Sequence, residues 1–157
     1  MEKEKLVATK RDIDPLRAIV ELLRKRDHRT MVLWATYCAE HVLPYFEEKY
    51  PKDNRPRKAV EAGRAWVRGD IAMGEARTAA FAARDAARDA DQAAARAAAR
   101  AAGHAAATAH VAGHAVHAAT YAVTAATCAA GPTDADAATA KERVWQYEHL
   151  LDLGGKP

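Results

Sequence analysis

The chain has 157 residues, of which 29% are charged, and its formal net charge at pH 7 is +3. A chain of this length buries about 70% of the surface that it exposes when unfolded, so a hydrophobic core alone can stabilise it. The two cysteines, Cys38 and Cys128, are too few for a disulfide framework. The small net charge and the lack of a long basic stripe lead us to expect no nucleic-acid binding.

The N-terminus reads Met1-Glu-Lys-Glu-Lys and is followed by no apolar stretch, so it does not resemble a signal peptide. We therefore expect a cytoplasmic protein. Caps, prolines and glycines divide the sequence into helices with no strand between them. This pattern predicts a single all-α domain over residues 1–157, with frayed ends at residues 1–12 and 152–157.

Two helices are predicted in the first third of the chain. Asp14-Pro15 supplies an N-cap followed by proline at the first helical position, and apolar residues then recur at helical spacing to about residue 26. A second helix should begin near residue 27 and run toward residue 50. Because a proline interrupts it, we expect a kink or break over residues 40–44.

The next two predicted helices are marked by a capping signal and by distinct polar and apolar sides. Asp53-Asn-Arg-Pro56 repeats the cap-then-proline signal and opens a third helix that should end at Arg68-Gly69. A fourth helix is expected over about residues 70–90, with arginines on a side facing water and alanines on a side facing a neighbouring helix. The arginines are Arg77, Arg84 and Arg88, and the alanines are Ala76, Ala80, Ala83 and Ala87.

The most informative segment is the run 101–133, which has no charged residue but carries four histidines among alanines. Alanine is the best helix former, so a fifth helix can continue unbroken over residues 91–130, with a break at Gly103 as the alternative. We expect this long Ala/His-rich helix at the centre of a compact bundle of about six helices, where glycines allow neighbours to approach closely. A last helix should start near Thr133.

The same run is longer than the about 20 residues that a membrane span requires. Alanine is only marginally apolar, however, and histidines and threonines are costly in lipid. We therefore expect no membrane segment.

Burying a histidine without a hydrogen-bond partner costs about 1–3 kcal/mol, so the four histidines need an explanation. On a continuous helix, His110, His114 and His117 lie within an arc of about 60°, while His104 lies off this arc and closest to His114. Two histidines four residues apart on a helix can bind Zn²⁺. Structural hydrogen bonding is the preferred interpretation, with metal binding and a partner-facing or pH-sensitive role as alternatives.

The second predicted helix adds Cys38 and His41 at a spacing of three residues. If this face met the histidine stripe, three or four N and S ligands could hold a metal ion. The sequence lacks His-Glu-x-x-His, Glu-x-x-His and His-Asp, so the signal is weak and we assign no cofactor. The candidate metal ligands are His110, His114, His117, Cys38 and His41.

The residues give little support for an enzyme. The chain has no serine, its glycines form no phosphate-binding loop, and Cys38 near His41 lacks the exposed elbow that nucleophiles use. We therefore expect no catalytic residue, with a metal-dependent enzyme as the alternative. The tryptophans are expected to anchor the core.

Four segments of the chain carry a distinctive order of motifs. They are Val32-Leu-Trp-Ala-Thr-Tyr-Cys-Ala-Glu-His-Val-Leu-Pro44, Arg57-Lys-Ala-Val-Glu-Ala-Gly-Arg-Ala-Trp66 with Gly74-Glu-Ala-Arg77 behind it, Ala101-Ala-Gly-His-Ala-Ala-Ala-Thr-Ala-His-Val-Ala-Gly-His114, and Glu142-Arg-Val-Trp-Gln-Tyr-Glu-His-Leu150. Together, over roughly residues 30–151, these segments resemble the immunity proteins of bacterial polymorphic-toxin systems.

The resemblance implies an all-α, non-enzymatic cytoplasmic protein that binds and neutralises a cognate protein toxin. Candidate toxin contacts are the arginine side of residues 70–90 and the acidic pair Glu47-Glu48. A metal-binding protein and an oligomer that pairs its alanine faces are the alternatives. The family pattern falls on seven hallmark positions, which we expect to lie in the core: Trp34, Cys38, His41, Trp66, His104, His110 and His114.

Overall fold

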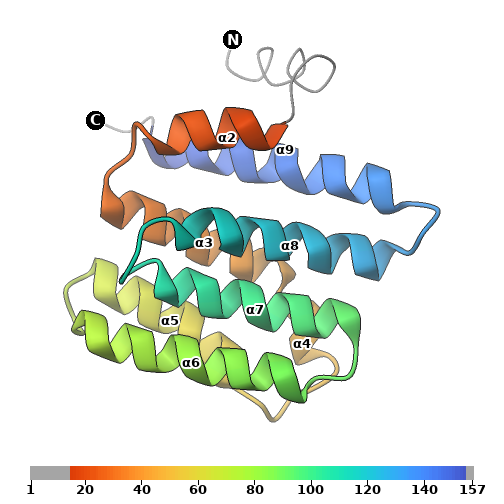
Figure 1. Ribbon diagram of the computed structural model, residues 1–157, viewed down its shortest axis with the longest axis horizontal. Helices are drawn as coiled ribbons and strands as arrows, with labels where there is room; N and C mark the ends of the chain where they lie inside the picture. The colour runs from red at the N-terminus through yellow and green to blue at the C-terminus, as the bar shows by residue number, and fades with distance from the viewer. Residues whose placement is uncertain (1–14, 155–157) are drawn as a thin grey trace.

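The computed structural model describes residues 15–154, which form eight α-helices and no strand (Figure 1). This confirms the all-α class, while the expected number of about six helices is too low. The helices are α2 (Pro15–Leu23), α3 (His28–Val42), α4 (Pro44–Glu47), α5 (Arg55–Val67), α6 (Met73–Asp89), α7 (Ala93–Ala107), α8 (His114–Ala130) and α9 (Ala135–Gly154).

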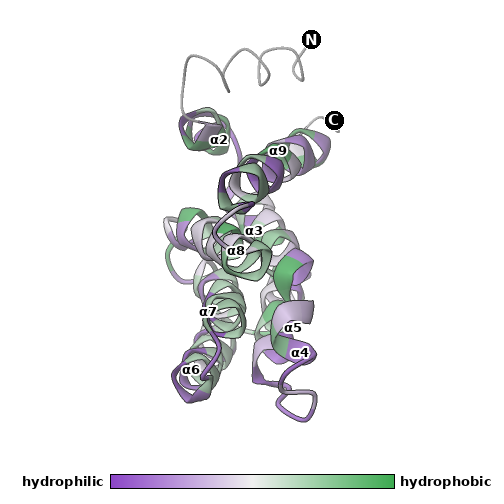
Figure 2. Ribbon diagram, turned by 90° about the vertical axis from the view of Figure 1, so that its right-hand side faces the viewer, coloured by the Kyte–Doolittle hydropathy of each residue, from purple (hydrophilic) through white to green (hydrophobic). Residues whose placement is uncertain are grey.

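The helices form a stack whose long elements run side by side (Figure 1). At one end α2 packs on α9, and at the other end α6 packs on α5 and α7. Between them, α3 and α8 contact each other and separate α9 from α5 and α7. The side view shows that α6 and α9 carry more hydrophilic residues than α7 and α8, which fits their outer positions (Figure 2).

The helix boundaries near residues 27 and 44 confirm the sequence signals. The Oδ1 atom of Asp27 accepts a hydrogen bond from the backbone N–H of Thr30 at 2.7 Å, so Asp27 is the N-cap of α3. Pro44 cannot donate a backbone hydrogen bond, so α3 ends at Val42 and the short α4 begins at Pro44.

Both the predicted continuous helix over residues 91–130 and the alternative break at Gly103 are wrong, because α7 continues through Gly103 to Ala107 and α8 begins at His114. The hydroxyl of Thr108 donates to the carbonyl of His104 at 2.8 Å, and the Thr108 carbonyl accepts from Nε2 of His28 at 2.6 Å. An unbroken helix over this span would be about 60 Å long, whereas a globule of this size is about 40 Å across. Folding back lets the alanines of α7 and α8 pack against each other.

The core is built largely from alanine. Nine of the residues of α7 are buried, and all of them are alanine except Gly103. A Cβ atom at Gly103 would lie 3.2 Å from the carbonyl oxygen of Ala80, so this glycine lets α7 approach the α6 backbone closely. Gly113 has no such neighbour within 4 Å and instead precedes α8. The alanine side of α6 is buried as predicted: Ala76, Ala80, Ala83 and Ala87.

Polar groups connect α9 to the centre of the stack. The indole N–H of Trp34 in α3 donates to the carbonyl of Gln146 at 2.9 Å. The amide Nε2 of Gln146 donates to the carbonyl of Ala119 in α8, also at 2.9 Å. Both side chains are fully buried, so they join three helices through hydrogen bonds inside the core.

The chain ends differ in part from the expectation. Residues 152–154, predicted to be frayed, belong to α9. The predicted fraying of residues 1–12 and 155–157 lies outside the described residues. No helix within residues 15–154 is both long enough and apolar enough to cross a membrane.

Gly131 ends α8 with φ at 86° and ψ at 169°, a backbone conformation that is nearly restricted to glycine. We expect Gly131→Ala to lower the free energy of unfolding by about 1–3 kcal/mol because it strains this turn. Gly74→Ala is the matched control, since Gly74 has no positive φ and a Cβ atom there would meet nothing within 4 Å. Urea unfolding of both variants checks this, and equal stabilities would contradict the role of Gly131.

Candidate functional site

Helices α6, α7 and α8 border a recess of about 590 Å³, a size typical of sites that take small ligands. The side chains around it include four arginines, three histidines, Phe81 and Tyr121, and the described lining residues include no carboxylate. One of the arginines, Arg88, pairs with Asp85 on its own helix. The four arginines are Arg77, Arg84, Arg88 and Arg100.

Three of these arginines form no ion pair with any carboxylate in the described part of the chain. The guanidinium carbons of Arg77 and Arg84 lie 5.4 and 4.9 Å from the ring centroid of Phe81, and that of Arg100 lies 5.8 Å from the ring of Tyr121. Aromatic contacts orient a guanidinium but leave its N–H groups available. These donors therefore face water or a bound anion.

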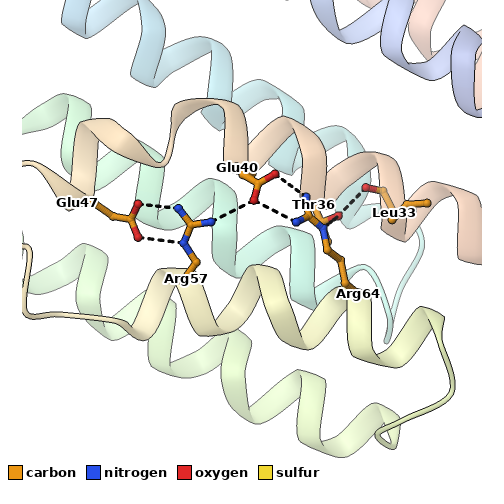
Figure 3. A network of polar contacts seen from close by, with 6 residues as sticks. All are labelled: Leu33, Thr36, Glu40, Glu47, Arg57 and Arg64. Atoms are coloured by element: carbon orange, nitrogen blue, oxygen red, sulfur yellow. Dashed lines mark hydrogen bonds and ion pairs between the residues drawn. The ribbon is translucent and has the colours of Figure 1, made fainter.

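The arginines of α5 are arranged in the opposite way (Figure 3). Arg57 forms two hydrogen bonds to Glu47, at 3.0 and 2.7 Å, and a third to Glu40 at 3.1 Å. Arg64 binds the same Glu40 at 2.9 and 3.1 Å and the hydroxyl of Thr36 at 3.2 Å. In this network two glutamates balance the charges of the two arginines. Most arginines of the recess have no such carboxylate partner among the described residues.

Aromatic rings from α7 and α8 form a cluster at the recess. Nδ1 of His104 in α7 lies 2.9 Å from Nδ1 of His114 in α8. The His104 ring stacks on Tyr121 with an interplanar angle of 11°, and the centroid of the His117 ring is 5.4 Å away. In the His104–His114 hydrogen bond one nitrogen donates and the other accepts, so at least one of the two rings is neutral.

The environment of His104 disfavours its charged form. Burial, followed by the nearby rings of His114 and His117 and the positive charges of Arg100 and Arg84, lowers the pKa of His104 to about 4. Burial also lowers the pKa of His114. Near neutral pH the His104 ring is therefore neutral and lies beside permanently charged guanidinium groups.

This lowered pKa predicts how stability changes with pH. The unfolded chain protonates His104 near its ordinary value of 6.5, while the folded chain resists protonation down to about pH 4. The free energy of unfolding should therefore fall as the pH falls through this window and be unaffected by His104 above it. His104→Asn should flatten the decrease, as urea unfolding across this pH range can measure. Identical slopes for wild type and His104→Asn would contradict the prediction.

A second recess of about 410 Å³ contains His41 and lies along α9. Nδ1 of His41 lies 2.7 Å from Oε2 of Glu142, and the His41 ring stacks on Trp145 at 3.8 Å. Trp145 in turn stacks on His149, whose pKa is lowered chiefly by burial. The histidine and carboxylate are therefore held by packing between α3 and α9.

The five predicted metal ligands do not converge on one site. Cys38 is fully buried, which raises the pKa of its thiol, and His41 lies in the second recess. His110 lies in the turn before α8 and is exposed, so it does not share a helical arc with His114 and His117. Within residues 15–154 no group of three or more His, Cys, Asp or Glu side chains is placed to hold a metal ion.

The hallmark positions are spread over the molecule instead of forming one cluster. Of the seven, two are buried, three are half-buried and two are exposed, so the expected core placement is wrong for the exposed pair. The buried residues are Trp34 and Cys38, the half-buried ones are Trp66, His104 and His114, and the exposed ones are His41 and His110.

Sequence reasoning identified the arginine side of α6 but not the recess. Phe81 was missed, although arginines four residues before it and three residues after it are a pattern that places all three side chains on one helical face. Arg100 was missed because its neighbours come from α6 and α8, and their meeting depends on the turn after α7. The pairing of His104 with His114 depends on the same turn.

Comparison with protein families matches residues 21–153 to the Imm-5 like putative immunity protein family. The matched segment extends from the end of α2 to the penultimate residue of α9 and so includes both recesses. Comparisons with curated proteins and with solved structures give no match. Since the match covers most of the chain, the protein belongs to the Imm-5 like putative immunity protein family.

Proposed function

We propose that the protein is a cytoplasmic immunity protein that binds one protein toxin and neutralises it by covering its surface, without catalysis. The family match over residues 21–153 carries this proposal. The described helices pack into a continuous core from α2 to α9, so they offer preformed surfaces for a partner. A preformed surface lowers the entropy that binding costs.

The toxin contact is proposed on the side of α6 that borders the recess. Phe81 is 43% exposed although it is a large apolar residue, and Arg77 and Arg84 lie over its ring. Arginine and aromatic residues are enriched among the residues that contribute most to protein–protein affinity. Helix α6 lies at the free end of the stack, where a partner can reach it (Figure 1).

The other candidate contact, Glu47-Glu48, receives less support. Both carboxylate oxygens of Glu47 accept hydrogen bonds from Arg57 (Figure 3). A partner would have to replace these charge-assisted bonds, which makes Glu47 a weaker anchor than an unpaired arginine. The proposed toxin-binding surface of this protein is therefore basic and aromatic, and the toxin surface that it contacts should be acidic.

Phe81→Asp is expected to weaken toxin binding by at least about 30-fold, which corresponds to about 2 kcal/mol, because it removes an apolar anchor and pairs its arginines with a new carboxylate. Tyr45→Asp is the matched control, since Tyr45 is 38% exposed, lies on α4 and does not line the recess.

The test is growth of cells that express the toxin together with each variant, combined with calorimetric titration of the purified pair. We expect Tyr45→Asp to protect as well as wild type and Phe81→Asp to protect poorly. Equal protection by both variants would exclude α6 as the contact, and failure of wild type to protect against any toxin of its own cell would contradict the function.

A further inference from the structure

The recess between α6, α7 and α8 has a charge arrangement that a protein contact alone does not require. We propose that it binds a small anion carrying two or more phosphate charges, held between Arg84 of α6 and Arg100 of α7 beside His104. Arg84 also belongs to the proposed toxin contact, but anion binding goes beyond that function and does not depend on it.

The recess is concave, and its volume of about 590 Å³ lies in the range typical of sites that bind small ligands. Arg84 and Arg100 line it from two different helices, and both lie near enough to His104 to lower the pKa of its ring. A ligand inside would therefore meet guanidinium groups from two sides.

Neither Arg84 nor Arg100 forms an ion pair with a carboxylate in residues 15–154, whereas Arg57 and Arg64 of α5 are both matched by glutamates (Figure 3). Like charges gathered in a concave site repel each other and focus a positive potential into it. A multivalent anion offsets this repulsion, and a monovalent one offsets less of it.

The hydrogen-bond donors of the recess suit a phosphate ligand. A guanidinium presents N–H groups in a planar fork that matches the oxygens of a phosphate, and charge-assisted bonds of this type are strong. The rings of Tyr121 and Phe81 leave these N–H groups free while limiting how far the side chains can swing. No described carboxylate lines the recess to repel an anion.

The experiment is calorimetric titration of the full chain with inorganic pyrophosphate at neutral pH and low salt. Wild type should bind one equivalent saturably, and Arg84→Gln/Arg100→Gln should bind at least about tenfold more weakly because two charge-assisted contacts are lost. Arg17→Gln/Arg24→Gln is the matched control: it removes two exposed arginines of α2 and its C-terminal turn, away from the recess. Its affinity should stay within about twofold of wild type.

A second readout reports the place of binding. The positively charged groups that face His104 are Arg84 on α6 and Arg100 on α7, and the titratable rings that face it are His114 and His117 on α8. An anion among them opposes their effect, so pyrophosphate should move the NMR titration of the His104 ring to higher pH.

Three results would overturn the proposal. The first is a wild-type titration without saturation. The second is an equal loss of affinity in the recess and control variants, which would show only general charge attraction. The third is a hexaglutamate peptide that binds the recess as tightly as pyrophosphate, which would assign it to acidic polypeptides instead. Circular dichroism of both double variants, whose replaced side chains are exposed, verifies that they are folded.

Discussion

Replacement of Trp34 by alanine is expected to lower the free energy of unfolding by about 3–5 kcal/mol. The side chain is fully buried in α3, and its removal leaves a large cavity at the centre of the stack. It also removes the N–H group that donates to the carbonyl of Gln146 at 2.9 Å, so the connection between α3 and α9 is weakened. Urea unfolding followed by circular dichroism measures the change without depending on tryptophan fluorescence.

Trp34→Phe separates the two contributions. It keeps most of the buried apolar surface but loses the N–H donor, so we expect a decrease of only about 1–2 kcal/mol. Trp66→Ala is a further control, because Trp66 is only half-buried and packs on the ring of His28 at 5.0 Å. If Trp34→Ala destabilises the protein no more than Trp66→Ala, Trp34 is not the main core anchor.

Gln146→Leu should lower the free energy of unfolding by about 2–3 kcal/mol although leucine is of similar size and apolar. The Oε1 atom of Gln146 accepts a hydrogen bond from Arg143 at 3.0 Å, and its Nε2 atom donates to the carbonyl of Ala119. Leucine can replace neither bond, and it deprives a buried guanidinium of one acceptor.

Gln92→Leu is the matched control for this prediction. Gln92 is exposed and its side chain makes no capping bond at the start of α7, so the same substitution there should change stability by less than about 0.5 kcal/mol. Parallel urea unfolding of the two variants compares them directly. A stability gain in Gln146→Leu would mean that packing outweighs the hydrogen bonds at this position.

Local signals in the sequence were sufficient for most helix boundaries. Asp27 caps α3, Pro44 separates α4 from α3, and Gly131 ends α8, because each acts through its own backbone or that of close neighbours. The arginine and alanine sides of α6 were predictable for the same reason, since residues three and four apart share a helical face.

The turn between α7 and α8 could not be found in this way. Helix propensity favours a helix that continues through Thr108. The side chain that donates a hydrogen bond to the Thr108 carbonyl is that of His28, which is distant in sequence. That turn brings His104 to His114 and Arg100 to Tyr121, so the recess could not be predicted from the sequence either. The prediction of a histidine stripe on one helix failed because it assumed the continuous helix.

The measurement that tests the central claim most directly is the residual activity of the purified toxin at increasing molar ratios of this protein. Neutralisation by binding predicts that activity falls in proportion to added protein and reaches zero near one equivalent. Loss of activity at far below one equivalent would show that the protein acts as a catalyst, and unchanged activity at a large excess would contradict an immunity role.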